Sequence, residues 1–190
     1  DGHGAPLPLT PASRAEWRAW LAARHAQEQG LWVVLAKKGT PGLRYDDAVE
    51  EALCYGWIDS LMRPIDEGHF RQWFSPRRPG SGWSARNKER VARLEEAGLM
   101  APPGRAKVAA AQADGSWGLY DAAEALTEPD DLAAALREAP GAVEGFAAMR
   151  PSLRRGLIAW VASAKRPQTR AARVAKGVTA ALGGPRPPGE

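Results

Sequence analysis

Residues 57–75 read WIDSLMRPIDEGHFRQWFS, and they set the architecture of the surrounding chain. Two segments, Trp57–Ile65 and His69–Ser75, flank the triplet Asp66-Glu67-Gly68. Acidic residues and glycine favour a tight turn, and Gly68 can adopt the left-handed conformation of a bulged hairpin. The pattern therefore predicts an antiparallel β-hairpin.

The side chains of this hairpin are expected to alternate between two faces. Strict alternation places Trp57, Asp59, Leu61, Arg63 and Ile65 on one face, and Ile58, Ser60, Met62 and Pro64 on the other. We expect Arg71 to share the face of Arg63, with Asp59 as the carboxylate between the two arginines, because opposed like charges destabilise a sheet. A face that mixes Asp, Arg and Trp is more typical of a polar pocket than of a closed core.

The segments before the hairpin predict two helices and one strand. Thr10-Pro11, followed by Trp17, Trp20 and Leu21, predicts a helix that starts at Thr10 and ends before Gly30. The run Leu31–Leu35 predicts a buried strand, which we extend to residue 37. Asp46-Asp47 and the apolar positions that follow predict a second helix, which carries Cys54 and ends at Gly56.

The remainder of the chain is predicted to be helical. A loop rich in Pro, Gly and Ser spans 75–82, Ser84 starts a helix, Pro102-Pro103 opens another, and Trp117 and Tyr120 are assigned to a loop. From residue 127 onward the periodicity predicts only helices, with an interruption at Pro167. We therefore predict an α+β fold, in which strand 31–37 and hairpin 57–75 form a small antiparallel sheet packed by helices and the C-terminal half is all helical.

Composition limits the class of protein. The chain has 190 residues, of which 44% are apolar and 25% charged, and this predicts one domain over 10–182 with flexible segments at 1–9 and 183–190. A single cysteine excludes an intrachain disulfide, and with three scattered histidines we expect neither a metal site nor a cofactor. No pattern of a signal peptide or spanning helix is found, so we expect a soluble cytoplasmic protein and no membrane partner. The oligomeric state stays open.

Several motifs in a fixed order carry a family resemblance. They are Leu31–Lys38, the run Tyr45–Ser60 (YDDAVEEALCYGWIDS), Phe74–Arg78 (FSPRR), Trp83-Ser84 with Asn87 and Arg90-Val91, and Ala164–Arg170 (AKRPQTR). Together they cover about residues 10 to 182 and resemble the YdeI/OmpD-associated, or bacteriocin-protection, family. The resemblance implies a small bacterial cytoplasmic protein connected with tolerance of antimicrobial peptides and toxins, and it implies no reaction or cofactor.

The candidate ligand site groups side chains of the hairpin, its exit loop and the following helix start. Its members are Trp57, Asp59, Ser60, Arg63, Arg71, Trp73, Arg77, Trp83, Ser84 and Asn87. Arginine forks donate to anions and tryptophan faces stack on rings, so this set favours an anionic or aromatic small molecule or peptide as the ligand. We therefore predict a non-catalytic binding or protection protein. The alternative role of the set is an internal Arg–Asp network that fixes the hairpin.

Two other functional classes stay open. An enzyme could use Asp59 as an acid or Cys54 as a nucleophile, although the position of Cys54 predicts a buried, unreactive thiol. A nucleic-acid or protein-interaction module could use basic residues of the C-terminal helices: Arg154, Arg155, Lys165, Arg166, Arg170, Arg173 and Lys176. A solvated helix face is the commoner explanation of that set, and aromatic residues are not interleaved with it, so we expect nucleic acid not to be a partner.

Overall fold

A computed structural model of the chain describes residues 7–185, which divide into two compact units. The first unit contains residues 7–81 and 86–114, and the second contains 82–85 and 115–185. Each unit has a hydrophobic core of its own. A single domain over 10–182 stays a prediction.

The first unit is built on a three-stranded antiparallel sheet. Strands β1 (Leu31–Ala36), β2 (Trp57–Pro64) and β3 (His69–Pro76) lie in the order β1-β3-β2. The Asp66 carboxylate accepts hydrogen bonds from the backbone N–H groups of Gly68 and His69, both at 2.7 Å, and this closes the turn between β2 and β3. The predicted hairpin and the α+β fold are confirmed.

Strand β2 contains a bulge that changes the two faces of the hairpin. Asp59 pairs with Phe74 and Met62 pairs with Gln72, so two residues of β2, Ser60 and Leu61, stand opposite one residue of β3. Arg63 pairs with Arg71, as expected. Strict alternation along β2 was wrong, because the extra residue shifts the count by one. Arg63 and Arg71 therefore lie on the face opposite to that of Trp57 and Asp59.

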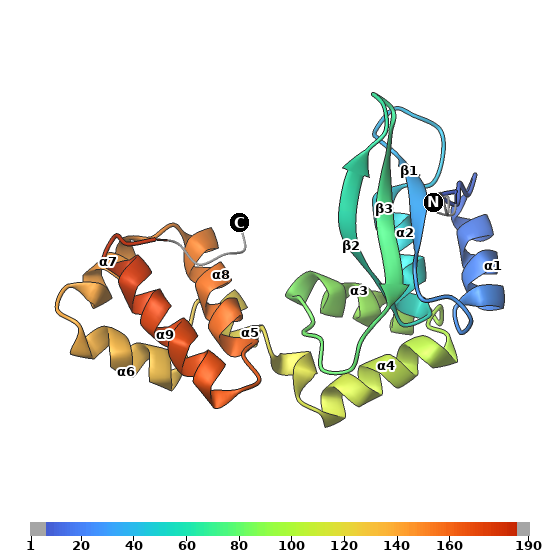
Figure 1. Cartoon of the computed structure of the whole chain (residues 1–190). Helices are drawn as coiled ribbons and strands as arrows, with labels where there is room; N and C mark the ends of the chain where they lie inside the picture. Colours follow the sequence, from blue (N-terminus) through green and yellow to red (C-terminus); the bar gives the residue numbers. More distant parts are fainter. Residues whose placement is uncertain (1–6, 186–190) are drawn as a thin grey trace, which may run out of the picture. The chain divides into compact units, whose positions relative to one another are not determined.

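Helices α1 (Arg14–Arg24) and α2 (Tyr45–Cys54) cover one face of the sheet, and α2 lies behind the strands in Figure 1. The Trp17 ring lies 5.5 Å from the Phe74 ring, measured between centroids. The predicted start of the first helix at Thr10 was wrong. Ser13 is the N-cap instead, since its hydroxyl accepts from the Glu16 N–H at 3.2 Å.

The core of the first unit is rich in large side chains, and two further helices close it. The fully buried residues include Trp17, Leu21, Leu53, Trp57 and Phe74. Helix α3 (Ala85–Glu96) follows the loop after β3, and α4 (Pro102–Ala113) packs against the end of α2. A Cβ at Gly104 would lie 2.3 Å from the Cys54 carbonyl oxygen, so this helix contact requires glycine.

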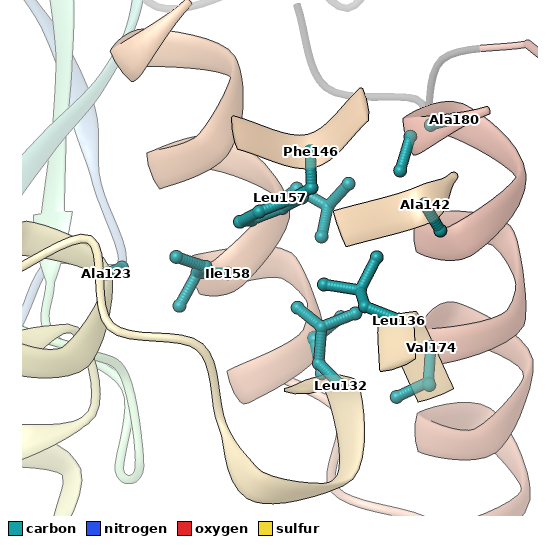
Figure 2. Packing of buried hydrophobic residues seen from close by; sticks show 11 residues of the cluster. Ala123, Leu132, Leu136, Ala142, Phe146, Leu157, Ile158, Val174 and Ala180 are labelled. Atoms are coloured by element: carbon teal, nitrogen blue, oxygen red, sulfur yellow. The ribbon is translucent and has the colours of Figure 1, made fainter. Parts of the chain in front are cut away.

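The second unit is helical, which confirms the prediction for the C-terminal half. It contains a 3-10 turn η1 (Ser116–Gly118) and the helices α5 (Asp121–Glu124), α6 (Asp130–Glu138), α7 (Ala142–Ala148), α8 (Pro151–Ala162) and α9 (Pro167–Ala181). Leu132, Leu136, Phe146, Leu157 and Ile158 fill its core (Figure 2).

Two local predictions for the second unit were wrong. Trp117 lies in the 3-10 turn η1, and Tyr120 caps the short helix α5, where a loop was expected. The predicted interruption at Pro167 is confirmed: α8 ends at Ala162, and α9 begins at Pro167, since proline is well suited to the first turn of a helix, where its missing N–H has no partner to lose.

The predicted flexible ends, 1–9 and 183–190, lie largely outside the described residues. Leu9 is described, and it pairs with Val33: its N–H donates to the Trp32 oxygen and its own oxygen accepts from the Val34 N–H, both at 2.8 Å. Within residues 7–185, no helix is long and apolar enough to cross a membrane.

Candidate functional site

The face of the sheet that α1 and α2 cover, the inner face, holds two of the predicted site residues. Trp57 is 1% exposed, and its indole N–H donates to the His25 carbonyl oxygen at 3.2 Å. Its ring lies edge-on to Trp20, with 5.8 Å between the centroids. These contacts make Trp57 a core residue with a satisfied N–H.

Asp59, the second inner-face residue, is held by two donors. The Tyr45 hydroxyl donates to Asp59 Oδ2 at 2.8 Å, and the Gln72 amide donates to the same oxygen at 3.1 Å. Burial and this hydrogen bond raise the pKa of Tyr45 to about 12, so Tyr45 stays a neutral donor. The sequence analysis missed both partners. Gln72 alternates with Phe70 and Phe74 along β3, and that position could have indicated an inward-pointing amide.

The opposite face of the sheet, the outer face, carries Trp32, Arg63, Arg71 and Trp73. Trp32 pairs with Trp73, and Arg63 pairs with Arg71. The Arg71 guanidinium lies 4.8 Å from the Trp32 ring centroid, and the Trp32 and Trp73 rings are T-shaped with 5.5 Å between centroids. The three side chains are half-buried, whereas Arg63 is exposed.

The two opposed arginines of the outer face have no carboxylate partner within residues 7–185. The expectation that Asp59 lies between them was wrong, because the bulge places Asp59 on the inner face. Trp32 belongs to this group but was absent from the predicted set. Trp32 can be assigned to this group only from the register of β1 against β3, and the sequence alone does not give that register.

Three more predicted residues lie in the bulge of β2, in the exit loop and at the start of α3. Ser60 is exposed in the bulge. Arg77 is buried, with its backbone N–H donating to the Gly56 oxygen and its carbonyl accepting from Lys107 Nζ, both at 2.9 Å. The Asn87 side-chain oxygen accepts from Arg90 Nη1 at 2.9 Å. Arg77 therefore contacts α4 through Lys107, whereas the contact of Asn87 lies within α3.

Trp83 and Ser84 belong to the second unit. Trp83 is buried, and its ring centroid lies 4.9 Å from that of Trp117. The structure thus brings together Arg63, Arg71 and Trp73 on the outer face and keeps Trp57 and Asp59 on the inner face. A ligand pocket formed by the ten predicted residues together stays a prediction.

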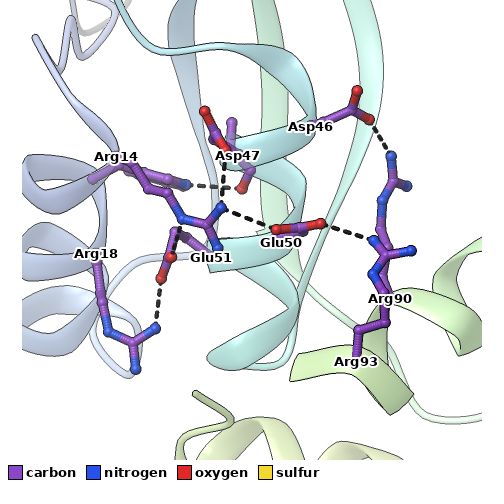
Figure 3. Close-up of polar contacts among 10 residues, drawn as sticks. Arg14, Arg18, Asp46, Asp47, Glu50, Glu51, Arg90 and Arg93 are labelled. Carbon is purple, nitrogen blue, oxygen red and sulfur yellow. Dashed lines mark hydrogen bonds and ion pairs between the residues drawn. The ribbon is translucent and has the colours of Figure 1, made fainter. Parts of the chain in front are cut away.

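A network of ion pairs surrounds α2 and joins it to α1 and α3 (Figure 3). Glu51, only 2% exposed, accepts from Arg14 Nε at 2.6 Å and from Arg18 Nη1 at 2.7 Å. Glu50 bridges Arg14 and Arg93, each at 3.0 Å. The sequence analysis missed this network, although the acids of α2 lie on an obvious helical pattern, because their partners are distant in the chain.

Comparison with known families assigns the segment that contains the whole sheet to a family. Residues 9–107, more than half of the chain, match the family model described as "Domain of unknown function (DUF8412)". The chain belongs to the DUF8412 family. Residues 125–184 match a second model, described as "Bacteriocin-protection, YdeI or OmpD-Associated". No curated protein and no solved structure matches the chain.

The resemblance found in the sequence is confirmed by the second match, over residues 125–184. Of the motifs that carried it, Ala164–Arg170 lies inside this bacteriocin-protection segment. The earlier motifs, from Leu31 to Val91, lie inside the DUF8412 segment. The candidate ligand residues of the sheet thus belong to the DUF8412 segment.

Cys54, the possible nucleophile, lies within the DUF8412 segment at the end of α2. Its side chain is fully buried, as predicted, and burial raises the pKa of its thiol. His69, the one histidine near the hairpin, bonds to Asp66 at the turn. Among the described residues, no group of His, Cys, Asp and Glu is arranged to hold a metal ion.

The basic residues of the bacteriocin-protection segment are mostly engaged with the second unit itself. Arg154 pairs with Glu128 and Arg155 pairs with Glu124. Arg170 pairs with Asp131, and Arg173 donates to the Trp160 carbonyl at the end of α8. Lys165, Arg166 and Lys176 are exposed. These contacts agree better with a solvated helix surface than with a phosphate-binding surface.

Proposed function

We propose that the chain is a binding protein whose outer face captures a ligand that carries an anionic group next to a planar ring. The observation that carries this proposal is the opposition of Arg63 and Arg71 with no carboxylate partner within the described residues. Like charges opposed on a sheet destabilise it, and an anion bound between them removes this penalty. Arginine forks bind carboxylates and phosphates through two parallel hydrogen bonds.

The tryptophans of the outer face supply the second half of the ligand specificity. Trp32 and Trp73 are half-buried and meet edge to face, so they form a rigid aromatic surface beside Arg71. Aromatic rings stack on such surfaces with little loss of side-chain freedom. A ligand with a ring and an adjacent anion would therefore contact Trp and Arg at once, which a simple inorganic anion would not.

The match of residues 125–184 to a bacteriocin-protection family supports a protective role for this capture. We propose that the protein sequesters an aromatic, anionic small molecule or peptide in the cytoplasm and so contributes to antimicrobial tolerance. Sequestration requires binding without turnover, and no cofactor is needed for it.

The binding half of the proposal is tested with 2-naphthoate as the probe and the neutral 2-naphthylmethanol as its matched control, by isothermal titration calorimetry. We expect naphthoate to bind more tightly than the alcohol. Arg71→Ala should weaken naphthoate binding about tenfold or more, since it removes a charge-assisted hydrogen bond. Arg71→Lys should restore only part of the affinity, because Lys lacks the planar fork.

Arg78→Ala is the control variant, since Arg78 is an exposed arginine of the exit loop outside the outer face. Equal binding of the acid and the alcohol, or unchanged affinity in both Arg71→Ala and Trp73→Ala while each stays folded, would overturn the proposal. Recovery of the bound compound unchanged supports sequestration. Recovery of a modified compound would identify an enzyme instead.

A further inference from the structure

A cleft lies in the first unit, away from the outer face of the sheet. It is an open cleft of about 340 Å³ formed by α1, α2 and the C-terminal end of α3. Arginines and glutamates of all three helices form its polar side, and Leu94, Ala97 and Leu99 form an apolar side. A cleft of this size is at the lower end of the range for small-molecule sites.

The acceptors that line the cleft are already used by the protein. Both oxygens of Glu51 accept, one from Arg14 and one from Arg18 (Figure 3). Both oxygens of Glu50 are also paired, Oε2 with Arg14 and Oε1 with Arg93. A ligand that needs acceptors, such as an amine, would have to compete with these ion pairs.

The donors that line the cleft are used less completely. A guanidinium has five N–H donors and no acceptor. Arg93 is 62% exposed, and only its Nη2 contacts a carboxylate, that of Glu50. Arg14 directs Nε and Nη1 to the acids of α2, and its Nη2 is left over. Each carboxylate oxygen of Glu50 and Glu51 thus already has an arginine partner, whereas Arg93 and Arg14 keep N–H donors without one, and this favours an anionic ligand.

The apolar side limits the shape of that anion. Leu94 is buried beneath the cleft, and Leu99, 39% exposed, stands at its edge. The Leu99 carbonyl accepts from Arg18 Nη2 at 2.8 Å, which fixes the chain at this edge. A short alkyl chain laid along Leu99 and Ala97, which are both exposed, would remove apolar surface from water.

We propose that this cleft binds a small carboxylate with a short alkyl chain, with the carboxylate on Arg93 and Arg14 and the alkyl chain on Leu94 and Leu99. The site is independent of the outer face, and neither ligand class implies the other.

Hexanoate is the probe, and hexan-1-ol is its neutral control. Binding is followed by NMR on the full chain, through the leucine methyl groups and the arginine Nε–H groups. We expect hexanoate, and not hexanol, to shift the resonances of Leu94, Leu99 and Arg93. Arg93→Gln should weaken hexanoate about tenfold. The matched control is Arg105→Gln, which changes an exposed arginine paired with Glu95 outside the cleft.

Three results would overturn this inference: no saturable binding of hexanoate, equal binding of hexanol, or unchanged affinity in Arg93→Gln with the fold retained. Shifts confined to the indoles of Trp32 and Trp73 would place the acid on the outer face and overturn it as well. Arg71→Ala separates the two proposals, since it should weaken naphthoate and leave hexanoate unchanged.

Discussion

The two units of the chain bury different kinds of side chain. In the first unit, the buried residues include Glu51, Gln72, Arg77 and Arg90, and these join a core of large aromatic rings. The hydrophobic cluster of the second unit consists of Leu, Ile, Val, Phe and Ala, Trp83 and Ser116 are its further buried aromatic and polar residues, and its ion pairs are partly exposed. Buried polar groups cost free energy unless they are paired, so a unit that keeps several is a better place to look for chemistry.

The family matches divide the chain in the same way. The description that names a biological role, bacteriocin protection, covers 125–184, whereas the candidate ligand residues lie in the segment described only as a domain of unknown function. The role named by the family and the side chains proposed to bind a ligand therefore belong to different parts of the chain. The stability of each unit therefore has to be measured with a variant and a signal that belong to that unit.

The sharpest test of this comparison removes one core leucine from each unit. Leu53 and Leu132 are both fully buried, so Leu53→Ala and Leu132→Ala should each reduce the free energy of unfolding by about 2–5 kcal/mol. A single domain predicts that both variants lower one shared transition in calorimetry. Two transitions, each moved by its own variant alone, would contradict the single domain and show that the units unfold separately.

The buried ion pairs of the first unit give the next largest effect. Glu51→Gln removes the charge that Arg14 and Arg18 share, and breaking a buried pair costs roughly 3–5 kcal/mol. We expect about 2 kcal/mol, because the two arginines are one-third exposed and regain water. Urea denaturation measures the loss. Glu95→Gln, at an exposed pair with Arg105, is the control and should cause no measurable change. Equal losses of stability in the two variants would show that the buried pairs of Glu51 contribute no more than an exposed pair.

Alkaline pH should act on the first unit through Tyr45. Its pKa is raised to about 12 from an ordinary value of 10.0, chiefly by burial. The neutral phenol is favoured in the folded state, so this contribution to stability is present below pH 10 and is lost as the pH rises toward 12. The difference in tyrosinate absorbance between the protein and Tyr45→Phe reports this one group. Ionisation of Tyr45 together with exposed tyrosines would show that its phenol is neither buried nor bonded to Asp59.

Acid pH should have a smaller effect on the second unit, through Asp131. The hydrogen bond from Arg170 is the main cause that lowers the pKa of Asp131 below its ordinary value of 3.8. The contribution to stability is present above pH 3.8 and is lost as the pH falls through the lower, folded-state pKa. Asp131→Asn should cost less than about 1 kcal/mol at neutral pH, because the pair is partly exposed. The free energies of unfolding of the unchanged protein and of Asp131→Asn should therefore converge as the pH falls. A constant difference between them across acid pH would show that Asp131 does not cause the pH dependence.

Local patterns were sufficient for most of the fold. The hairpin follows from the turn at 66–68, and the helices follow from their periodicity and their opening prolines. The outer face could not be predicted in full, since Trp32 reaches Trp73 only through the pairing of β1 with β3. The partners of Glu51 lie 37 and 33 residues away, and no local pattern reports such contacts. The bulge likewise could not be predicted, because it depends on the register of β2 against β3, which also pairs with β1.

The bulge also determines where β2 tolerates a change of length. Ser60 and Leu61 together face a single residue of β3, so deletion of either one would restore a regular ladder with Asp59 still opposite Phe74 and Arg63 still opposite Arg71. A deletion elsewhere in the strand would exchange the inner and outer faces on one side of the lost residue. Length variation among relatives is therefore expected to concentrate at this pair, where a codon can be lost without moving an arginine into the core.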